Sequence, residues 1–273
     1  MGHPAEAGLA VLPAPATADR WTCEHVLSIR YWTPTLLSIR TTRYRGFRFT
    51  PGHYARVGIE RDNGTVWRPY SVVSASYDAY LEFLAVLVPG GEFSLALSAL
   101  RVGDPILVEK PSYGFLTLDQ LAPGRDLWLL ASGSGLGPFV SILREPGAAG
   151  AWERFEHVIL VHSVRRADEL AYREELGALS GDELLARHPA RFSYVPIVTR
   201  EPGATPLSAR IPQLLADGRL VSAVGTQLSV ENSRLMVCGN PEMARELRAL
   251  LGERGFATNR RGTLGQMAFE KYW

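Results

Sequence analysis

The sequence Arg68-Pro69-Tyr70-Ser71 lies in a strand-like stretch, and a turn at Pro89-Gly90-Gly91-Glu92-Phe93-Ser94 opens a short helix downstream of it. An arginine can bind a diphosphate in a bidentate manner, and the N-terminus of a helix offers free backbone N–H groups to the same anion. A tyrosine beside them can lie flat against a large aromatic cofactor. The two segments together predict a flavin dinucleotide site, although an isolated Arg-x-Tyr-Ser is more often part of a half-buried strand.

Residues 24 to 118 have the pattern of a β domain. Short runs rich in Val, Ile, Leu and aromatic residues recur there, separated by turn signals such as Thr50-Pro51-Gly52 and Val102-Gly103-Asp104. The expected strands are His25–Trp32, Thr35–Thr41, His53–Ile59, Arg68–Ser74, Leu81–Val88 and Pro105–Glu109. Several short strands at this spacing predict a sandwich or barrel, with Glu92–Leu100 as its helical segment.

The pattern changes at Pro123-Gly124-Arg125-Asp126, where apolar strands begin to alternate with helices. The expected strands are Leu127–Ala131, Val158–Ser163, Phe192–Val198, Leu235–Cys238 and a final extended run to Trp273. The expected helices are Phe139–Glu145, Asp168–Leu179, Ala209–Ala216 and Glu242–Gly252. Such alternation predicts a doubly wound parallel sheet. We therefore expect a mostly disordered arm over residues 1–20, a barrel domain over residues 21–120 and an α/β domain over residues 121–273.

Two features of the second half predict a nucleotide site. Ser132-Gly133-Ser134-Gly135-Leu136-Gly137-Pro138 connects the first strand to the first helix, and its glycines allow the backbone to approach a diphosphate closely. The next strand ends at Arg165 without the acid that is typical of NAD-binding units, and Arg200 and Arg210 follow later in the chain. Arginines at these positions favour NADP(H), because they suit a 2′-phosphate. The alternative is a tight strand–helix turn with solvated arginines.

The last strand–turn–helix and the end of the chain supply further candidates. Cys238 ends the strand and Asn240 precedes the helix, at the edge where open α/β sheets bind ligands. A small buried structural cysteine is the alternative. Phe269, Tyr272 and Trp273 make the terminal segment unusually aromatic, so it docks either on something flat or on the protein's own core.

The composition excludes several classes of protein. The 273 residues include 29 Lys and Arg against 28 Asp and Glu, so nothing indicates nucleic acid or a membrane surface as an electrostatic partner. No apolar run is long enough to span a bilayer. Cys23 and Cys238 are too few for a disulfide scaffold or for an iron–sulfur cluster held by four cysteines of this chain. We expect a cytoplasmic monomer without a metal site.

From about residue 22 to its end, the chain resembles the bacterial (plant-type) ferredoxin/flavodoxin–NADP(+) reductase family. The resemblance rests on an ordered set of motifs: Arg68-Pro69-Tyr70-Ser71, Leu81-Glu82-Phe83, Gly91-Glu92-Phe93-Ser94, Gly133-Ser134-Gly135-Leu136-Gly137-Pro138-Phe139, Val161-His162-Ser163-Val164-Arg165, Val198-Thr199-Arg200-Glu201, Cys238-Gly239-Asn240-Pro241-Glu242-Met243 and Tyr272-Trp273. It implies an antiparallel six-stranded FAD-binding β-barrel followed by a doubly wound NADP-binding domain.

The resemblance also implies roles for individual residues. It places Arg68 on the FAD diphosphate, Tyr70 against the isoalloxazine and Ser71 near the flavin N5. The other residues implied at the FAD site are Pro69, Val86, Val88, Gly91, Glu92, Phe93, Ser94 and, on the adenine, Trp273. Those implied at the NADP site are Ser134, Gly135, Arg165, Arg200, Arg210, Cys238 and Asn240. The implied catalytic residues are Ser71, Cys238 and Phe269, and either Phe269 or Tyr272 would cover the isoalloxazine where nicotinamide docks.

The activity that the resemblance implies is exchange of a hydride between NADP(H) and FAD, and of single electrons between FAD and a ferredoxin or flavodoxin. Alternatives are the NAD(P)H-dependent reductase component of an oxygenase, a flavin reductase, a non-catalytic nucleotide-binding module on the same fold, and a structural protein without cofactor. A run of arginines, Arg40, Arg43, Arg45 and Arg48, could dock an acidic partner or form a solvated face.

Overall fold

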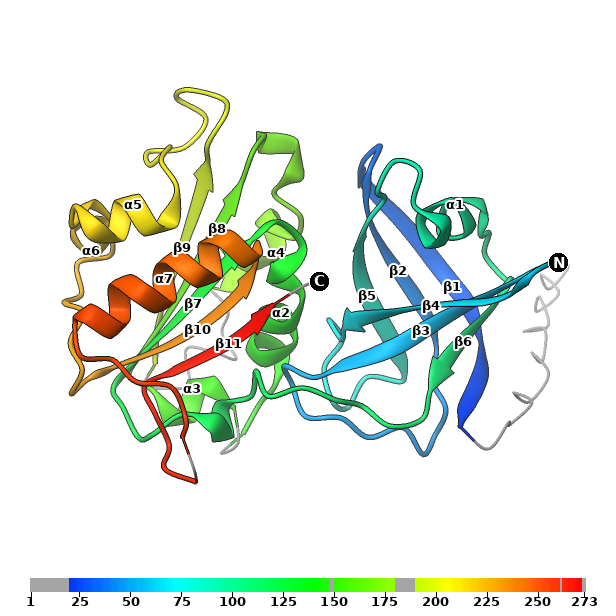
Figure 1. Cartoon of the computed structure of the whole chain (residues 1–273), viewed down its shortest axis with the longest axis horizontal. Coiled ribbons are helices and arrows are strands. Elements are labelled where there is room, and N and C mark those ends of the chain that lie inside the picture. Colours follow the sequence, from blue (N-terminus) through cyan, green and yellow to red (C-terminus); the bar gives the residue numbers. More distant parts are fainter. Residues whose placement is uncertain (1–19, 148–149, 180–189, 261, 272–273) are drawn as a thin grey trace, which may run out of the picture.

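The computed structural model describes residues 20–147, 150–179, 190–260 and 262–271. The expected arm, apart from Arg20, and the roles expected of Tyr272 and Trp273 lie outside the described residues. The chain forms two sheets that lie side by side, each with its own helices (Figure 1). The first sheet is antiparallel with six strands, and the second is parallel with five, so the predicted fold class is confirmed.

The first sheet and one helix make up what we call the barrel domain. Its elements are β1 (Trp21–Thr33), β2 (Leu36–Thr42), β3 (Tyr54–Arg61), β4 (Gly64–Ser71), β5 (Tyr80–Val86), α1 (Glu92–Ala99) and β6 (Pro105–Glu109). The strand order is β4-β3-β6-β1-β2-β5, and the two ends of the sheet meet at an isolated bridge between Val72 and Phe83. Alternate residues of β3, such as Ala55 and Val57, are buried, so the core lies inside the curled sheet.

Pro69 lies on β4, which is an edge strand of this sheet. A proline cannot donate to a ladder of strand hydrogen bonds, and edge strands tolerate it for that reason. Pro69 pairs with Arg56 of β3 on one side only, within the described part of the chain. The edge position of β4 therefore accommodates Pro69.

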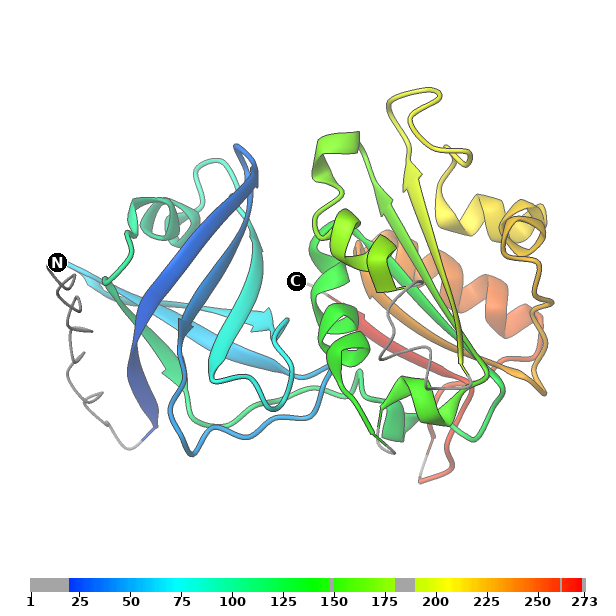
Figure 2. The same cartoon turned by 180° about the vertical axis from the view of Figure 1, so that it is seen from behind.

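The second sheet and the remaining helices make up what we call the α/β domain. Its strands are β7 (Asp126–Ser132), β8 (His157–Val164), β9 (Arg191–Val198), β10 (Ser233–Gly239) and β11 (Met267–Lys271). Its helices are α2 (Gly137–Arg144), α3 (Ala151–Arg154), α4 (Arg173–Ala178), α5 (Ile211–Ala216), α6 (Arg219–Val224) and α7 (Pro241–Glu253), with 3₁₀ turns η1 (Leu118–Gln120), η2 (Gly133–Leu136) and η3 (Ala167–Glu169). Helices cover both faces of the sheet, as Figures 1 and 2 show. The sheet is therefore doubly wound, with the order β11-β10-β7-β8-β9.

The two faces of the parallel sheet bury separate cores. Helices α5, α6 and α7 pack on one face, where Trp128 and Val237 are fully buried. Helices α2, α3 and α4 pack on the other face, and that core also includes Leu36, Val73 and Leu84 of the barrel side. Because one apolar core continues across the domain interface, burial of apolar surface holds the two domains together.

The structure differs from the sequence-based expectation mainly in the segment Asp168–Leu179. The sequence predicts one helix over this segment, but η3 ends at Glu169 and α4 begins at Arg173. Tyr172 interrupts it with a left-handed backbone, at φ 58° and ψ 12°. The short helices α3 and α6 were not expected, since each is too short to carry a clear helical period.

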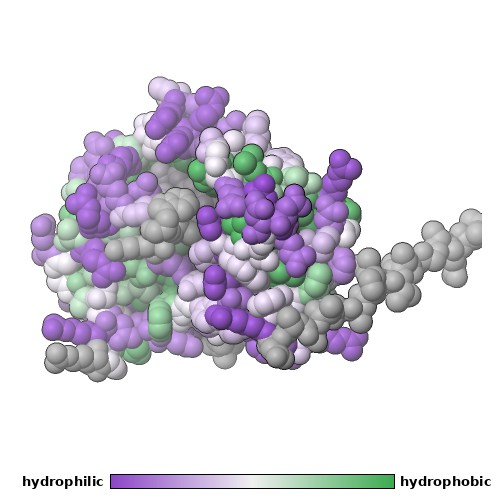
Figure 3. Space-filling model, turned by 45° about the vertical axis from the view of Figure 1, so that its right-hand side comes forward, coloured by the Kyte–Doolittle hydropathy of each residue, from purple (hydrophilic) through white to green (hydrophobic). Residues whose placement is uncertain are grey.

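Polar residues cover most of the face shown in Figure 3, and hydrophobic residues appear there in small groups. Among the described residues, no helix has both the length and the apolar character that a membrane span needs.

Candidate functional site

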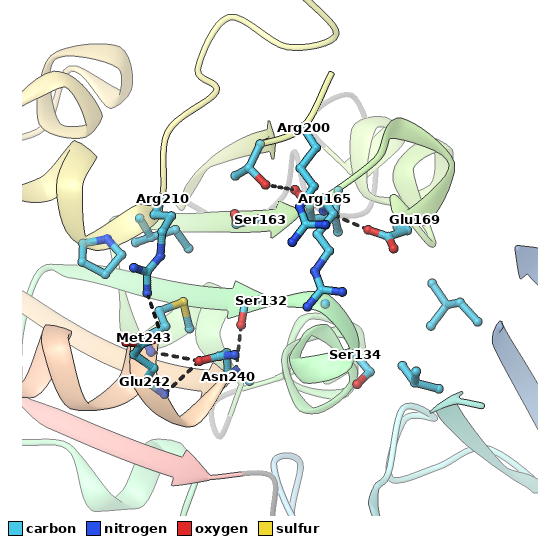
Figure 4. Close-up of a pocket in the computed structure, with 18 of the residues that line it drawn as sticks. Ser132, Ser134, Ser163, Arg165, Glu169, Arg200, Arg210, Asn240, Glu242 and Met243 are labelled. Carbon is cyan, nitrogen blue, oxygen red and sulfur yellow. Dashed lines mark hydrogen bonds and ion pairs between the residues drawn. The ribbon is translucent and has the colours of Figure 1, made fainter. Parts of the chain in front are cut away.

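A cavity of about 630 Å³ lies at the carboxyl ends of the parallel strands (Figure 4). The chain leaves β7 toward β8 on one side and returns to β10 on the other, so the order of the sheet reverses between β7 and β10. Open α/β sheets bind ligands at such a switch point. Ser132 and Asn240 line the cavity from these two strand ends, and Thr35, Leu36 and Val86 line it from the barrel domain. The cavity is therefore shared by both domains.

The glycine loop packs closely on its neighbours. A Cβ added at Gly135 would collide with the carbonyl oxygen of Cys238, and one added at Gly137 would lie 3.3 Å from a methyl group of Val73. The loop therefore needs Gly135 to lie against β10 and Gly137 to approach the barrel domain. Gly133, at φ 54°, has open space beside it and lines the cavity. Gly133 is thus the glycine that suits the expected approach of a diphosphate.

A buried histidine supports this loop, and the sequence analysis did not assign it a role. His162 of β8 is 1% exposed, and its Nε2 lies 3.1 Å from the carbonyl oxygen of Gly133. Burial lowers the pKa of His162 to about 4, so the ring is neutral at pH 7. A neutral ring with Nε2–H donates to the carbonyl and fixes the start of the loop.

Arg165 and Arg200 lie together at one end of the cavity, after β8 and β9 (Figure 4). The backbone N–H of Arg200 donates to the carbonyl of Arg165 at 2.9 Å, which holds the two residues side by side. The Glu169 carboxylate accepts hydrogen bonds from the backbone N–H groups of Arg165 and Arg166, at 2.8 and 3.1 Å. Neither the Arg165 nor the Arg200 guanidinium forms an ion pair with a described residue, so both are available to an anion.

Arg210 and Asn240 are also in the cavity wall, but other groups already engage them. The Arg210 guanidinium lies 3.0 Å from Glu246 and 3.8 Å from Glu242. The Asn240 side chain caps α7 by accepting from the backbone N–H groups of Glu242 and Met243. Arg210 therefore brings a partly neutralised charge, and Asn240 shapes the wall by starting the helix.

Ser71 and Glu270 meet where the barrel domain faces the last strand of the α/β domain. Ser71 Oγ donates to Glu270 Oε2 at 3.3 Å. Burial raises the pKa of Glu270 to about 7, although the Ser71 hydrogen bond opposes that shift. Cys238 of β10 is in register with Glu270 of β11, so the two side chains leave their parallel strands on the same face. Ser71 therefore contacts Glu270, and Cys238 lies on the same face of the sheet as Glu270.

The two halves of the chain match two domain families. Residues 28–115 match the oxidoreductase FAD-binding domain family, and residues 129–249 match the oxidoreductase NAD-binding domain family. The ferredoxin–NADP reductase A of Sorangium cellulosum is 40% identical over 255 residues, which cover 92% of this chain and 90% of that protein. The chain belongs to the ferredoxin–NADP reductase family.

Other members of the family cover nearly the whole chain as well. The flavodoxin/ferredoxin–NADP reductase of Escherichia coli is 35% identical over 226 residues, 83% of this chain and 88% of that protein. A crystal structure of a ferredoxin NADP+ reductase from Neisseria gonorrhoeae, with bound FAD and NADP, superposes with a TM-score of 0.86 at 37% identity. The match covers 93% of this chain and 99% of that one.

The residues of the family's FAD motif fit a dinucleotide. Arg68 on the edge strand β4 is exposed, and its guanidinium hydrogen-bonds only to the carbonyl of Trp67 among the described residues. Gly91 precedes α1 at the N-cap position and has no side chain to cap the helix, so the first N–H groups of α1 suit an anion. Ser94 accepts from the backbone N–H of Val88 at 2.9 Å and keeps its own hydroxyl proton to donate. An exposed guanidinium and an uncapped helix end form a suitable donor set for a diphosphate.

The other FAD-motif residues are placed as follows. Tyr70 packs on Phe93 with ring centroids 5.5 Å apart, and burial raises the pKa of Tyr70 to about 12. Val86 lines the cavity, Val88 is exposed, and Glu92 lies 3.6 Å from Arg61.

Phe269 is placed differently from the position expected for a residue that covers the flavin. It lies on β11 in register with Val237 and packs toward α7, where the Arg248 guanidinium lies 4.1 Å from its ring centroid. Successive residues of a strand point to opposite faces, so Phe269 faces α7 and Glu270 faces Ser71. The residue that the structure brings to Ser71 is therefore Glu270, which the sequence analysis did not select.

Proposed function

We propose that the protein is a flavoenzyme that exchanges a hydride between NADP(H) and FAD, and single electrons between FAD and a ferredoxin or flavodoxin. When bound, FAD would supply the chemistry that couples two-electron to one-electron transfer. The observation that carries the proposal is the shared site. The FAD motif ends at Ser71 on the barrel domain, and Ser71 contacts Glu270 beside the nucleotide cavity of the α/β domain.

Arg165 and Arg200 are the residues proposed to select NADP(H). Their guanidinium groups lie together and unpaired among the described residues, which suits the doubly charged 2′-phosphate of NADP(H). A charge-assisted hydrogen bond contributes about 1.5–3 kcal/mol. Two of them would favour NADPH over NADH by roughly two orders of magnitude or more.

Ser71 and Glu270 are the residues proposed to handle a proton at the reacting centre. With a pKa of about 7, the Glu270 carboxyl is present in both its protonated and its ionised form near neutral pH. A group with such a pKa can give and take a proton with little bias. The hydrogen bond to Ser71 Oγ connects this carboxyl to the end of the FAD motif.

The electron partner proposed is a ferredoxin or flavodoxin, as the names of the related reductases indicate. The arginine run of the barrel domain gives this proposal little support. Arg40 pairs with Glu82, and Arg43 donates to the backbone carbonyls of Ser76 and Asp78. Two of the four arginines thus stabilise the fold. Two cysteines in 273 residues are too few for a disulfide scaffold, which supports a reducing, cytoplasmic setting.

The visible absorption spectrum of the purified protein tests the proposal directly. We expect an oxidised-flavin spectrum that NADPH bleaches promptly without oxygen, and NADH only slowly. Added ferredoxin or flavodoxin should then be reduced in turnover. A protein that stays colourless after incubation with FAD would refute the proposal, and equal rates with NADH and NADPH would refute the part assigned to Arg165 and Arg200.

A further inference from the structure

Glu82 is a buried carboxylate of the barrel domain that the proposed chemistry does not use. It lies on β5 and is 2% exposed. The Tyr172 hydroxyl donates to its Oε1 at 2.8 Å, and Arg144 Nη1 donates to its Oε2 at 3.0 Å. Arg40 Nη2 adds a longer contact at 3.3 Å. Because Tyr172 and Arg144 belong to the α/β domain, the carboxylate is satisfied mainly from across the domain interface.

The backbone of Tyr172 explains how its side chain reaches this carboxylate. Tyr172 is the only described non-glycine residue with a positive φ, and glycine adopts this conformation at lower cost. Its ring lies 4.8 Å from the ring of Trp32, at the end of β1, and 5.5 Å from the Arg144 guanidinium. A strained conformation persists where the surrounding contacts determine it. The contacts of the Tyr172 side chain at the domain interface hold its backbone in this conformation.

Arg144 fixes the end of α2 to the barrel domain. Its Nη1 also donates to the carbonyl of Val73 at 3.2 Å, and its guanidinium pairs with both oxygens of Glu175. Burial alone would lower the pKa of Arg144, but Glu175 and Glu82 raise it, so the charge is kept. One turn earlier, Ser141 Oγ donates to the carbonyl of Ser74 at 2.8 Å. The last turns of α2 are therefore held on the segment that follows β4.

The other end of α2 lies at the reacting centre. The helix begins at Gly137, directly after the glycine loop, and a Cβ there would lie 3.9 Å from Ser71 Cβ. One short helix thus connects the loop that lines the nucleotide cavity to the contacts around Glu82. The position of α2 on the barrel domain sets the distance between Ser71 and that cavity.

We propose that Tyr172, Glu82 and Arg144 form an interdomain latch, and that Tyr172 is a positioning residue that aligns the nicotinamide with the flavin. This inference rests on the proposed function, because the alignment matters only if a hydride passes between groups held on the two domains. Within the described part of the chain, the hydrogen bonds of the latch residues do not involve Arg68 of the barrel domain or Arg165 and Arg200 of the α/β domain. A loosened latch therefore changes the reacting geometry and leaves each binding site intact.

Tyr172→Phe tests the latch, because it removes the hydroxyl and keeps the ring on Trp32. Tyr194→Phe is the matched control, since the buried Tyr194 hydroxyl has no hydrogen-bond partner in the described part of the chain. We expect unchanged FAD content and unchanged NADP+ affinity in both variants. Flavin reduction at saturating NADPH should slow by about tenfold or more in Tyr172→Phe alone, because small displacements of reacting groups carry large rate penalties.

Two further readouts separate positioning from stability. The long-wavelength absorbance of nicotinamide stacked on flavin should fall in Tyr172→Phe, and amide hydrogen exchange of residues 73–76 should become faster. Glu82→Gln, which keeps the size of the side chain, should produce the same changes. A lower melting temperature with wild-type reduction rate and wild-type absorbance in both variants would overturn the latch. Absence of NADPH-dependent reduction in the wild type would instead overturn the proposed function and the latch with it.

Discussion

Ser71 Oγ donates a hydrogen bond to Glu270 Oε2 at 3.3 Å, although the two residues are 199 positions apart in the chain. The contact joins the end of β4 in the barrel domain to the last strand of the α/β domain. It brings a carboxyl with a raised pKa to the residue that ends the FAD motif. The pair therefore places a group that titrates near neutral pH where we propose the reacting centre.

Glu270→Gln should change how stability depends on pH. Burial raises the pKa of Glu270 from 4.5 to about 7 in the folded protein, so the folded state holds its proton more tightly than the unfolded state. The resulting stabilisation is complete below pH 4.5 and is lost as the pH rises through 7. We expect urea unfolding to show that, between pH 5 and pH 8, the free energy of unfolding falls by about 2 kcal/mol more in the wild type than in Glu270→Gln.

The same variant should also change the pH dependence of turnover. We expect the wild-type rate with a one-electron acceptor to change with an apparent pKa near 7, as the Glu270 carboxyl does. Glu270→Gln should be slower and should lack that inflection. An inflection that persists near 7 in the variant would assign the titration to another group.

Much of the fold follows from local signals in the sequence. The strand Pro105–Glu109 has the predicted limits, and the glycine loop lies between a buried strand and a helix as expected. Arg165 and Arg200 lie together because the carboxyl ends of neighbouring parallel strands meet at one edge of the sheet. Such features depend on composition and turn chemistry over a few residues, which the sequence displays directly.

Whether Phe269 or Glu270 faces Ser71 depends on the pairing of β11 with β10, which the sequence does not display. A slip of one residue in the register of β11 against β10 would move every side chain to the other face. The observed register pairs Cys238 with Glu270 and Val237 with Phe269. An aromatic residue near a chain end suggested stacking on a cofactor, but the register assigns it to the core beside α7. The break at Tyr172 is likewise due to contacts across the domain interface, which act over long distances in the chain.

Phe269→Ala should destabilise the fold and leave the nucleotide affinity unchanged. The ring packs beside the core under α7, with the Arg248 guanidinium 4.1 Å from its centroid. Removal of a half-buried aromatic ring should cost about 2 kcal/mol in urea unfolding. NADP+ titration of the variant should give the wild-type dissociation constant. Tighter NADP+ binding would instead show that Phe269 covers the nicotinamide position.

Arg165→Ala and Arg200→Ala should weaken NADP+ binding by about ten- to a hundredfold each, through loss of a charge-assisted contact. NAD+ binding should be unaffected, because NAD+ lacks the 2′-phosphate.

Arg210→Ala should have a smaller effect, since Glu246 and Glu242 already share its charge. Arg219→Ala is the control, because Arg219 pairs with Asp217 and does not line the cavity. Equal losses for NADP+ and NAD+ in the Arg165 and Arg200 variants would contradict the 2′-phosphate assignment.

Gly135→Ala should destabilise the protein and displace the loop that lines the cavity. The new methyl group would lie 2.6 Å from the carbonyl carbon of Cys238, so either β10 or the loop has to shift. A cost of about 1–3 kcal/mol is expected from overpacking, together with weaker NADP+ binding. Gly177→Ala is the matched control, because Gly177 lies in α4 and no atom of the described residues would lie within 4 Å of a new Cβ.

The control should become more stable, by about 0.5–1 kcal/mol, because alanine loses less backbone freedom than glycine when a helix forms. Urea unfolding of the two variants beside the wild type therefore gives shifts of opposite sign for the same chemical change. A wild-type unfolding midpoint for Gly135→Ala would mean that the loop does not need its close approach to β10. In that case Gly135 would be required for nucleotide binding and not for packing against β10.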